Sequence, residues 1–561
     1  MMDFKQKIIE LIKKNTKLKT DEISNLLSVP PNPDLGDFAF PCFKLGKNPV
    51  ESANKLKDKI KIPDFLEKIE TKGPYLNFYL DKANFTEKIL TNIQKETKNY
   101  GKGREKKKIL VEYCGPNTNK PLHLGHVRNM ALGNAVVRIL EFQGNKVIPV
   151  NIINDRGIHI CQSMVAYQKW GKKQKPNKKG DHFVGDYYVL FSKKSKEDPN
   201  LDLEAKSLLL KWEEEDPETH KLWRKMNTWV LQGFQETYDR FGIAFEKEYF
   251  ESEIYKQGKE VAFEGLKKGV FEKNDDKSIT APLEKFGMTN KVVLRGDGTS
   301  VYITQDMFLA QQRYEDYKFD KLLYVVASEQ SMHFKQLFKI LELLKRKFAK
   351  NLHHLSYGMV HLPTGRMKSR EGTVVDADDI MDEISELAQK EVEKRYKNLS
   401  KKERKRRGEF ISLAAIKFFM LRSDASKDMV FDPKASLSFE GETGPYIQYT
   451  HARANSILKK ADVKITKVNY NLLQEPKEQA LISLLSKFPT KVEETARHYK
   501  PHIICRYLLD LAQAFNEFYH ACHVISEDKK LMEARVVLVA ATKQVLANGL
   551  KVLGIHAPEE M

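Results

Sequence analysis

Residues 108–157 read KILVEYCGPNTNKPLHLGHVRNMALGNAVVRILEFQGNKVIPVNIINDRG, and this stretch decides the fold of the chain. The apolar run at 109–111 is typical of a buried parallel strand, and a turn rich in glycine and proline follows it. Apolar residues then recur at helical spacing over 127–140, Gly144 ends the helix, and 147–153 is a second apolar strand. The stretch is therefore predicted to be a βαβ unit.

The turn between the first strand and the helix holds His123, Leu124, Gly125 and His126. A helix N-terminus presents free N–H groups and a positive dipole end, which suits a polyphosphate, and glycine lets a ligand approach the backbone. Imidazoles at this place can donate hydrogen bonds to phosphate oxygens as charge develops on them. An isolated HLGH match is more often two ordinary surface or core histidines. Its position at a strand-to-helix turn favours the phosphate site.

A second element, GRMKSREG at 365–372, has the complementary chemistry. It follows an apolar strand expected at 357–362, and the glycines on both sides indicate a loop whose cations could gather on leaving phosphates. Taken alone, such a loop is usually solvated surface. Together, HLGH and RMKSR resemble the paired signatures of class I aminoacyl-tRNA synthetases.

Further segments resemble one family of that class, the arginyl-tRNA synthetases, and the resemblance covers nearly the whole chain. These segments are VEYCGPNTNKPLH at 111–123, RGDGTSVYITQD at 295–306, YVVASEQSMHF at 324–334, and EGETGPYIQYTHAR at 440–453. The resemblance implies an α/β Rossmann-type (HUP) catalytic domain, an N-terminal α+β module and a C-terminal α-helical anticodon-binding bundle. It also implies that amino-acid activation requires bound tRNA.

Composition shifts and the resemblance together predict four parts of the chain. They are a tRNA-elbow module at 1–105, a catalytic domain at 106–375 with an insertion at about 158–290, a helical connector at 376–434 and the anticodon-binding domain at 435–561. The insertion is short for a separate editing domain. A cationic guanidinium needs no second sieve, because the synthetic site itself can distinguish it.

The resemblance assigns ATP contacts to both signatures. The residues concerned are His123, Gly125, His126, Met367, Lys368 and Ser369. The usual loop reads Lys-Met-Ser-Lys-Ser, whereas here the lysine is Lys368 at the third place and Ser369 is at the fourth. Some arginyl enzymes instead use a lysine just before the HLGH-type turn, where Lys120 stands. Lys120, Lys368 and Arg370 are therefore the alternatives for the catalytic cation, beside His123 and His126.

A pocket for arginine needs carboxylates that grip a planar fork, and an aromatic wall. The candidates are Glu112, Asn117, Glu251, Tyr302, Asp306 and Gln330. Asp306 would hold the fork, with Tyr302 one helical turn away as the wall. The resemblance implies that Asn117 and Gln330 hold the α-amino and carboxylate groups. Glu112 has an alternative interpretation as a structural carboxylate that pairs its neighbours.

The candidates for tRNA contacts come from both ends of the chain. They are Tyr75 and Asn77 in the N-terminal module, and Tyr446, Tyr449, Tyr519, His523 and Met561 in the C-terminal bundle. Such aromatic side chains can stack on unpaired bases, and the resemblance implies these positions. The rival interpretation is that the tyrosines belong to the cores of their domains.

Composition bounds the partners and the compartment. The chain has 95 Lys+Arg against 76 Asp+Glu, and a net charge of +19 favours a polyanion, although a generally basic proteome gives the same excess. Its five cysteines form no CxxC pair, so no structural zinc and no other resident metal is expected, and a reducing compartment fits. No apolar run is long enough for a membrane span. We expect a cytoplasmic monomer with tRNA(Arg), L-arginine and ATP with Mg²⁺ as partners.

Three other functions are weighed against this one. Another class I synthetase would need a different pocket, and the cysteinyl enzyme would need zinc ligands. A nucleotidyltransferase with the same turn would not need a basic chain of 561 residues with an RNA-binding end. A catalytically silent RNA-binding protein on the same scaffold would not need both histidines, Asp306 and Gln330.

Overall fold

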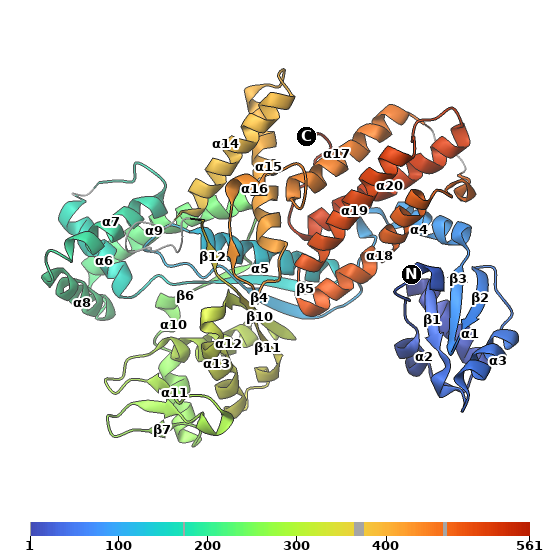
Figure 1. Ribbon diagram of the computed structural model, residues 1–561. Helices are drawn as coiled ribbons and strands as arrows, with labels where there is room; N and C mark the ends of the chain where they lie inside the picture. The colour runs from blue at the N-terminus through green and yellow to red at the C-terminus, as the bar shows by residue number, and fades with distance from the viewer. Residues whose placement is uncertain (1, 172–173, 364–374, 464–467) are drawn as a thin grey trace.

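The computed structural model describes residues 2–171, 174–363, 375–463 and 468–561. A small N-terminal module lies to one side, a large α/β domain occupies the centre, and a bundle of long helices forms the C-terminal end of the chain (Figure 1). Met367, Lys368, Ser369 and Arg370 lie outside the described residues. Within the described ranges no helix is both long and apolar enough to cross a membrane.

The N-terminal module is an antiparallel sheet of order β1-β3-β2 covered by helices. Its elements are α1 (Met2–Asn15), α2 (Thr20–Leu26), β1 (Phe38–Pro41), α3 (Pro49–Lys59), β2 (Leu66–Lys72) and β3 (Tyr75–Leu80). Phe4, Ile8 and Ile12 recur at helical spacing in the sequence and are buried on one face of α1. Helix α4 (Lys82–Glu96) then leads toward the centre of the molecule.

The centre of the catalytic domain is a parallel sheet of order β11-β10-β4-β5-β6. Its strands are β4 (Lys108–Glu112), β5 (Lys146–Ile153), β6 (Lys247–Phe250), β10 (Lys321–Ala327) and β11 (Leu352–Tyr357). Helix α5 (Leu124–Phe142) connects β4 to β5, so the predicted βαβ unit is confirmed. Ile109 and Val111 face one hydrophobic core and Leu110 the other, so both faces of the sheet are covered.

Two sequence-based expectations about this domain are corrected. The strand expected at 357–362 is split: β11 ends at Tyr357, and β12 (Val360–His361) instead pairs with β13 (Met429–Val430). Gly358 permits this change of direction, because a Cβ there would lie 2.6 Å from the backbone nitrogen of Asp428. The insertion expected at 158–290 contains β6, an edge strand of the central sheet. Its four residues, Lys-Glu-Tyr-Phe, give too weak a strand signal to be found in the sequence.

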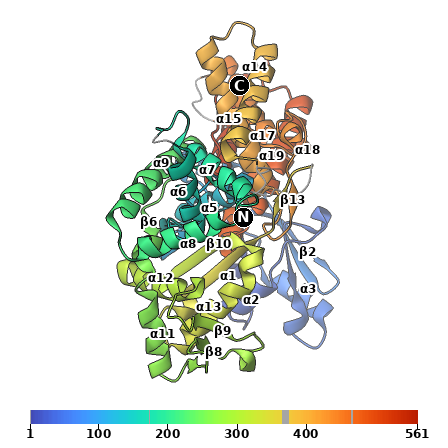
Figure 2. The ribbon, with the colours of Figure 1, turned by 90° about the vertical axis from the view of Figure 1, so that its left-hand side faces the viewer.

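Two lobes flank β6 in the chain. The first is helical, with α6 (Ile158–Trp170), α7 (Gly180–Lys194), α8 (Asn200–Glu213) and α9 (Pro217–Phe241). The second contains α10 (Glu251–Ile254), α11 (Gly258–Lys267), β7 (Glu272–Lys273), β8 (Ile279–Ala281), β9 (Lys291–Leu294), α12 (Tyr302–Tyr317) and α13 (Ser331–Leu343). Figures 1 and 2 show the two lobes on opposite sides of the carboxyl ends of the strands.

The rest of the chain is helical, as expected. It comprises α14 (Ala377–Arg395), α15 (Lys401–Leu421), α16 (Pro433–Ser436), α17 (Gly444–Ala461), α18 (Pro476–His498), α19 (His502–Ala521) and α20 (Lys529–Val552). Leu481, Leu485, Leu508 and Phe515 recur at helical spacing and are fully buried, so they form part of the core of the bundle. The segment after α4 packs on this bundle: Tyr100 donates to the carbonyl of Leu485 at 3.1 Å. The first and last parts of the chain are therefore in direct contact.

Candidate active site

The HLGH turn is held by hydrogen bonds between its own side chains and backbone. His123 is the N-cap of α5, and its Nδ1 accepts the N–H of Gly125 at 3.2 Å. Nδ1 of His126 accepts the N–H of His123 at 3.1 Å, and the two ring centroids are 3.9 Å apart. A Cβ on Gly125 would lie 3.0 Å from Cε1 of His123. A side chain at this position would press on the ring of His123, so glycine lets that ring lie against the backbone.

These bonds fix the protonation of both rings. Burial, together with the nearby Lys120 ammonium, lowers the pKa of His123 to about 3. Burial is also the main reason that the pKa of His126 lies well below its usual value, with further contributions from the neighbouring His123 and Lys120 side chains. Both imidazoles are therefore neutral. Because each Nδ1 accepts a hydrogen bond, the proton of each ring is on Nε2. The turn thus offers two Nε2–H donors, and Lys120 lies close to both rings.

The backbone donors of this turn already have partners, which corrects the expectation of free N–H groups at the helix end. The N–H of Leu124 donates to Val375, that of Gly125 to the His123 ring, and that of His126 to the His123 carbonyl. A phosphate at this turn would therefore be contacted by side chains. The macrodipole of α5 adds its positive end without free N–H groups in that first turn.

Both chain segments that border residues 364–374 are attached to α5 or to its N-terminus. On the far side, Ala377 donates to the carbonyl of Leu122 at 2.8 Å, and His123 and Asp376 form an antiparallel bridge. On the near side, the buried guanidinium of Arg128 donates to the carbonyls of Gly358 at 2.7 Å and Met359 at 3.1 Å. Arg128 was not among the predicted site residues, although an arginine among the apolar residues of a central helix was a usable signal.

Three of the predicted arginine-binding residues are carboxylates that come close to one another. Asp306, on α12, raises the pKa of both Glu112, at the end of β4, and Glu251, at the start of α10. Burial is the larger cause for both groups, and it brings the pKa of Glu251 to about 7. A region where three carboxyl groups converge suits a cationic ligand.

Glu112 already has a partner inside the protein. It forms an ion pair with the guanidinium of Arg313, which is fully buried and lies 5.0 Å from the centre of the Tyr249 ring. This contact matches the alternative interpretation of Glu112 as a structural carboxylate. Arg313 was missed because nothing in the sequence marks one arginine of a helix as buried.

Asp306 remains available for a ligand, and its orientation is fixed by a residue that was not predicted. Nε2 of His333 lies 2.6 Å from one carboxylate oxygen of Asp306. Tyr302 is one helical turn earlier and 75% exposed, so its ring is free to approach a ligand. Asn117 and Gln330 are exposed and follow the carboxyl ends of β4 and β10, neighbouring strands of the sheet.

Among the described residues, one group of side chains has the spacing of metal ligands: Asp181, His182 and Asp378. Its negative charge is already balanced within the protein. The ammonium of Lys179 lies 3.2 Å from Asp181 and 2.6 Å from Asp378. A bound cation would have to displace this lysine, so the group does not fit a metal ion.

A second candidate site is a cavity of about 900 Å³ in the C-terminal domain. It brings together four residues predicted to contact tRNA: Tyr449, Tyr519, His523 and Met561. Arg453 lies over the rings of Tyr449, at 4.8 Å, and Tyr519, at 5.7 Å. We call this cavity the C-terminal groove. Its half-exposed aromatic rings and its cations are the groups that bind unpaired nucleotides.

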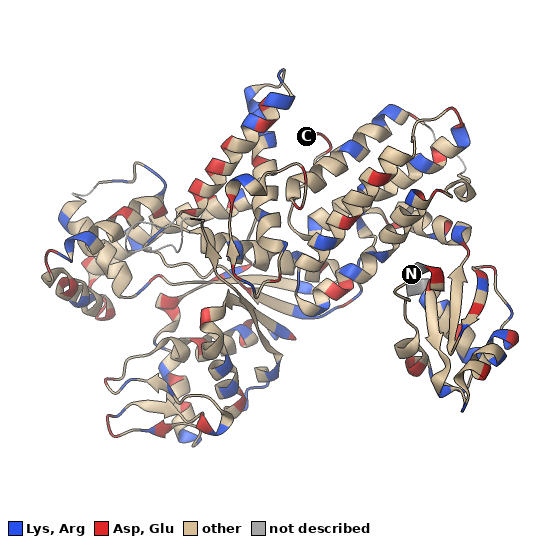
Figure 3. Ribbon diagram, in the orientation of Figure 1, with Lys and Arg blue, Asp and Glu red and all other residues tan. Residues whose placement is uncertain are grey.

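The groove has two further features. Asn516 accepts from Arg453 at 2.8 Å and donates to the hydroxyl of Tyr446 at 2.9 Å, which links Tyr446 to the groove. Tyr396 and Arg407, from the α14–α15 hairpin, line the side opposite the bundle. Lys and Arg residues gather at the tip of this hairpin (Figure 3). The connector therefore contributes to the groove, which the sequence did not indicate.

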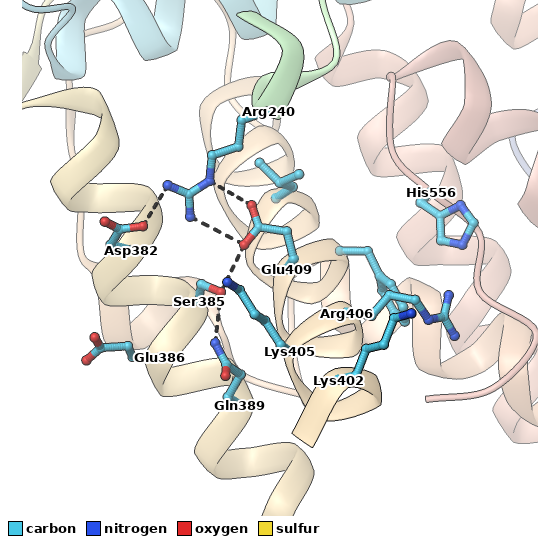
Figure 4. A pocket seen from close by; sticks show the side chains of 12 residues that line it. Arg240, Asp382, Ser385, Glu386, Gln389, Lys402, Lys405, Arg406, Glu409 and His556 are labelled. Carbon is cyan, nitrogen blue, oxygen red and sulfur yellow. Dashed lines mark hydrogen bonds and ion pairs between the residues drawn. The ribbon is translucent and has the colours of Figure 1, made fainter. Parts of the chain in front are cut away.

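Another cavity, of about 1000 Å³, lies where α9, α14, α15 and the C-terminal segment meet (Figure 4). Arg240 of α9 donates to Asp382 of α14 at 2.6 Å and to Glu409 of α15 at 2.8 Å. This ion-pair network fastens the first helical lobe to the connector.

The N-terminal module presents one exposed aromatic pair. Tyr75 is 41% exposed and meets the ring of Phe43, which is 56% exposed, edge to face at 5.9 Å. The side chain of Asn77 is only 2% exposed, because β3 is the central strand of its sheet. Of the two residues predicted here, Tyr75 can reach a base and Asn77 is almost covered.

Comparison with known proteins agrees with this arrangement. The profile of the family described as "tRNA synthetases class I (R), catalytic domain" matches residues 88–433. Profiles of an "Arginyl tRNA synthetase N terminal domain" and a "DALR anticodon binding domain" match 2–80 and 447–561. The catalytic profile thus includes most of the segment that was predicted to be a separate connector.

Individual proteins give the same result. An arginine–tRNA ligase of Treponema denticola is 45% identical over 558 residues, with 95% of this chain and 94% of that protein covered. One of Bacteroides fragilis is 43% identical, with 93% and 92% covered. The solved arginyl-tRNA synthetase of Thermus thermophilus superposes with a TM-score of 0.79 at 27% identity and covers 95% of this chain and 96% of that one. The chain belongs to the arginyl-tRNA synthetase family of class I aminoacyl-tRNA synthetases.

Proposed function

We propose that this chain is an arginine–tRNA ligase that works in two steps. In the first step, a carboxylate oxygen of L-arginine attacks the α-phosphorus of ATP, which enters as its Mg²⁺ complex, and the bond to the departing pyrophosphate breaks. In the second step, the terminal ribose hydroxyl of tRNA(Arg) attacks the arginyl carbonyl carbon, and AMP leaves. No covalent enzyme intermediate is needed. Catalysis rests on positioning and on stabilisation of charge.

At the phosphates, the proposal gives His123 and His126 the same role. Each neutral ring holds one Nε2–H that can donate to a phosphate oxygen as negative charge develops. Neutral rings suit this role, because they lose no proton to the phosphate. Lys120, next to both rings, is the described cation among the three alternatives for the pyrophosphate.

At the amino acid, the proposal assigns the guanidinium to Asp306 with help from Glu251. The oxygen of Asp306 that His333 does not contact is available for one arm of the fork. Tyr302 provides the wall, and Asn117 and Gln330 bind the α-amino and carboxylate groups. Glu112 acts on this site indirectly: it neutralises Arg313, which would otherwise repel a cationic substrate.

For tRNA, the proposal gives the C-terminal groove to the anticodon and the Tyr75 surface to the elbow. The net charge of +19 contributes long-range attraction. We further propose that the enzyme is a cytoplasmic monomer. Analytical ultracentrifugation with and without tRNA(Arg) tests the monomer, and a stable dimer would contradict it.

The observation that carries the proposal is the pair of neutral, mutually fixed histidines beside a pocket of convergent carboxylates. The test is ATP–pyrophosphate exchange with each of the twenty amino acids, with and without total tRNA. Exchange with arginine alone, appearing only when tRNA is present, supports both the identity and the coupling to tRNA. Exchange with arginine in the absence of tRNA removes the coupling. Exchange with another amino acid, or none at all, overturns the assignment of the pocket.

A further inference from the structure

A cluster of charged side chains lies next to the HLGH turn and has no role in the chemistry described above. It joins three parts of the chain that are distant in sequence. Lys179 and His182 are at the start of α7, Thr237 is near the end of α9, and Asp376 and Asp378 are at the start of α14. We call these five residues, with Asp181, the α7–α14 latch.

The latch is tightly bonded and largely buried. The carboxylate of Asp378 accepts from Lys179 at 2.6 Å, from Thr237 at 3.3 Å and from the ring of His182, whose Nε2 is 3.2 Å away. The other ring nitrogen of His182 lies 3.5 Å from Asp376. The side chains of Lys179, His182 and Asp378 are each less than one-fifth exposed. Solvent therefore screens these contacts weakly, and losing one member leaves a charge without compensation.

The latch holds the segment that pairs with the HLGH turn. Asp376 and His123 form a backbone bridge. The N–H of Leu124 donates to the carbonyl of Val375, and the N–H of Ala377 donates to the carbonyl of Leu122. His123 is the N-cap of α5, and these two bonds hold the backbone on both sides of it, while the N–H of Gly125 holds the ring itself. A displacement of 375–377 would therefore move the ring whose Nε2–H faces the phosphates.

Helix α7 also supports the opposite side of this pairing. A Cβ on Gly185 would lie 2.7 Å from Cδ of Pro121, so α7 packs directly on the residues that precede the turn. A Cβ on Gly233 would lie 2.4 Å from an oxygen of Asp181, so α7 is equally close to α9. Helix α7 thus packs on Pro121, just before the HLGH turn, and its His182 lies within ion-pair distance of Asp376 and Asp378 in the segment that pairs with the turn.

We infer that Lys179, His182 and Asp378 are positioning residues for adenylate formation, which act by holding 375–377 against the turn and thereby fixing His123. The inference rests on the proposed role of His123 and extends it to the first helical lobe. Its members touch neither arginine nor ATP in the proposed arrangement. A misplacement of about 1 Å at a reacting group costs about 100-fold in rate. A small shift of His123 after loss of the latch would therefore be enough to slow the chemical step.

The test is a double-mutant cycle between the latch and the ring. We expect Asp378→Asn to lower the single-turnover rate of arginyl-adenylate formation about 10- to 100-fold, with arginine affinity and tRNA affinity within about twofold. In a His123→Ala background the same change should lower the residual rate less than about twofold, since the residue acts through that ring. An equal factor in both backgrounds would overturn the inference.

Asp382→Asn is the matched control. Asp382 lies one turn further along α14 and also pairs with a cation of the first helical lobe, but this cation is Arg240 of α9, whose other ion-pair partner is Glu409 of α15 and not a residue of 375–377. Its rate should stay within about twofold of the parent; a loss equal to that of Asp378→Asn would assign the effect to the packing of α14. If Asp378→Asn fails to fold, Lys179→Ala and Lys179→Arg replace it, and the arginine variant should retain most of the rate. Full activity of His123→Ala would instead reject the proposed role of His123, whereas a deficient His123→Ala with a normal Asp378→Asn rejects the latch alone.

Discussion

The polar groups of the HLGH turn and those of the C-terminal groove differ in their burial and in their hydrogen bonds within the protein. In the turn, the described backbone donors and both Nδ1 atoms are used internally, and burial keeps the rings neutral. In the groove, Tyr519 is 39% exposed and His523 is exposed as well. The turn is organised before any substrate arrives, whereas the groove leaves its groups free to adapt.

This difference follows from what each site must bind. A phosphoryl group in transit has fixed geometry, and donors that need no reorganisation stabilise it best. Unpaired bases vary in shape, and an aromatic face can stack on any of them. The side chains of the groove therefore become ordered only when RNA binds, and the contacts to RNA offset the entropy that this ordering costs. Changes in the turn should therefore affect chemistry, and changes in the groove should affect affinity for tRNA.

The largest expected effect is at the turn. His126→Ala removes one preorganised donor and should lower the rate of adenylate formation about 10²- to 10³-fold. Single-turnover measurements at saturating ATP, arginine and tRNA provide the rate, and tRNA affinity by filter binding should be almost unchanged. A variant with full activity would remove the turn from the chemistry.

The second effect concerns the arginine pocket. Asp306→Asn leaves a guanidinium without its charged acceptor, which costs about 1.5–3 kcal/mol, and the KM for arginine should rise accordingly. The KM for ATP is the internal control and should not change. If both constants rise together, Asp306 supports the fold of the site and does not bind the substrate.

The third effect is at the groove. Tyr519→Ala removes a stacking surface and should weaken tRNA(Arg) binding by about 1–3 kcal/mol. At saturating tRNA the rate of adenylate formation should return to that of the parent, in contrast to His126→Ala. A loss of rate that excess tRNA does not restore would show that Tyr519 affects the chemical step as well as tRNA affinity, which contradicts the difference proposed between the two regions.

The fourth effect is a difference in pH dependence. Glu251, with its pKa raised to about 7, is neutral below that pH and ionised above it. Since cationic arginine prefers the ionised carboxylate, its affinity should rise about tenfold between about pH 6 and pH 8 and then level off. The KM for ATP should stay flat over this range, because the pKa of His123 is about 3 and that of His126 is also depressed. Glu251→Gln should flatten the arginine profile; a slope that persists would assign it to another group.

The smallest effect is expected in the N-terminal module. Tyr75→Ala removes one half-exposed ring from the pair with Phe43 and should weaken tRNA binding a few-fold, about 1 kcal/mol. Val29→Ala, at a more exposed apolar position of the same module, should have no effect on tRNA affinity. Equal losses in both variants would point to the stability of the module instead of a base contact.

Elements whose signal is local could be predicted from the sequence. The βαβ unit, the apolar stripe of α1 and the helices of the C-terminal bundle follow from hydrophobic period, and the HLGH turn follows from its place between a strand and a helix. Tyr449, Tyr519, His523 and Met561 were predicted from resemblance, which preserves position along the chain, and the structure places all four around one cavity. The short edge strand β6 escaped notice, since four residues with two charges have no clear period.

Which polar groups are paired could be seen only in the folded structure. Several contacts join residues that are distant in the sequence: Arg313 with Glu112, Arg128 with the carbonyls of Gly358 and Met359, and His333 with Asp306. The same is true of Lys179 and Asp378. Burial and partners of this kind set charge states and orientations, and they arise when the chain closes on itself. A sequence can therefore name the reacting groups, but their protonation and their geometry depend on neighbours that the fold supplies.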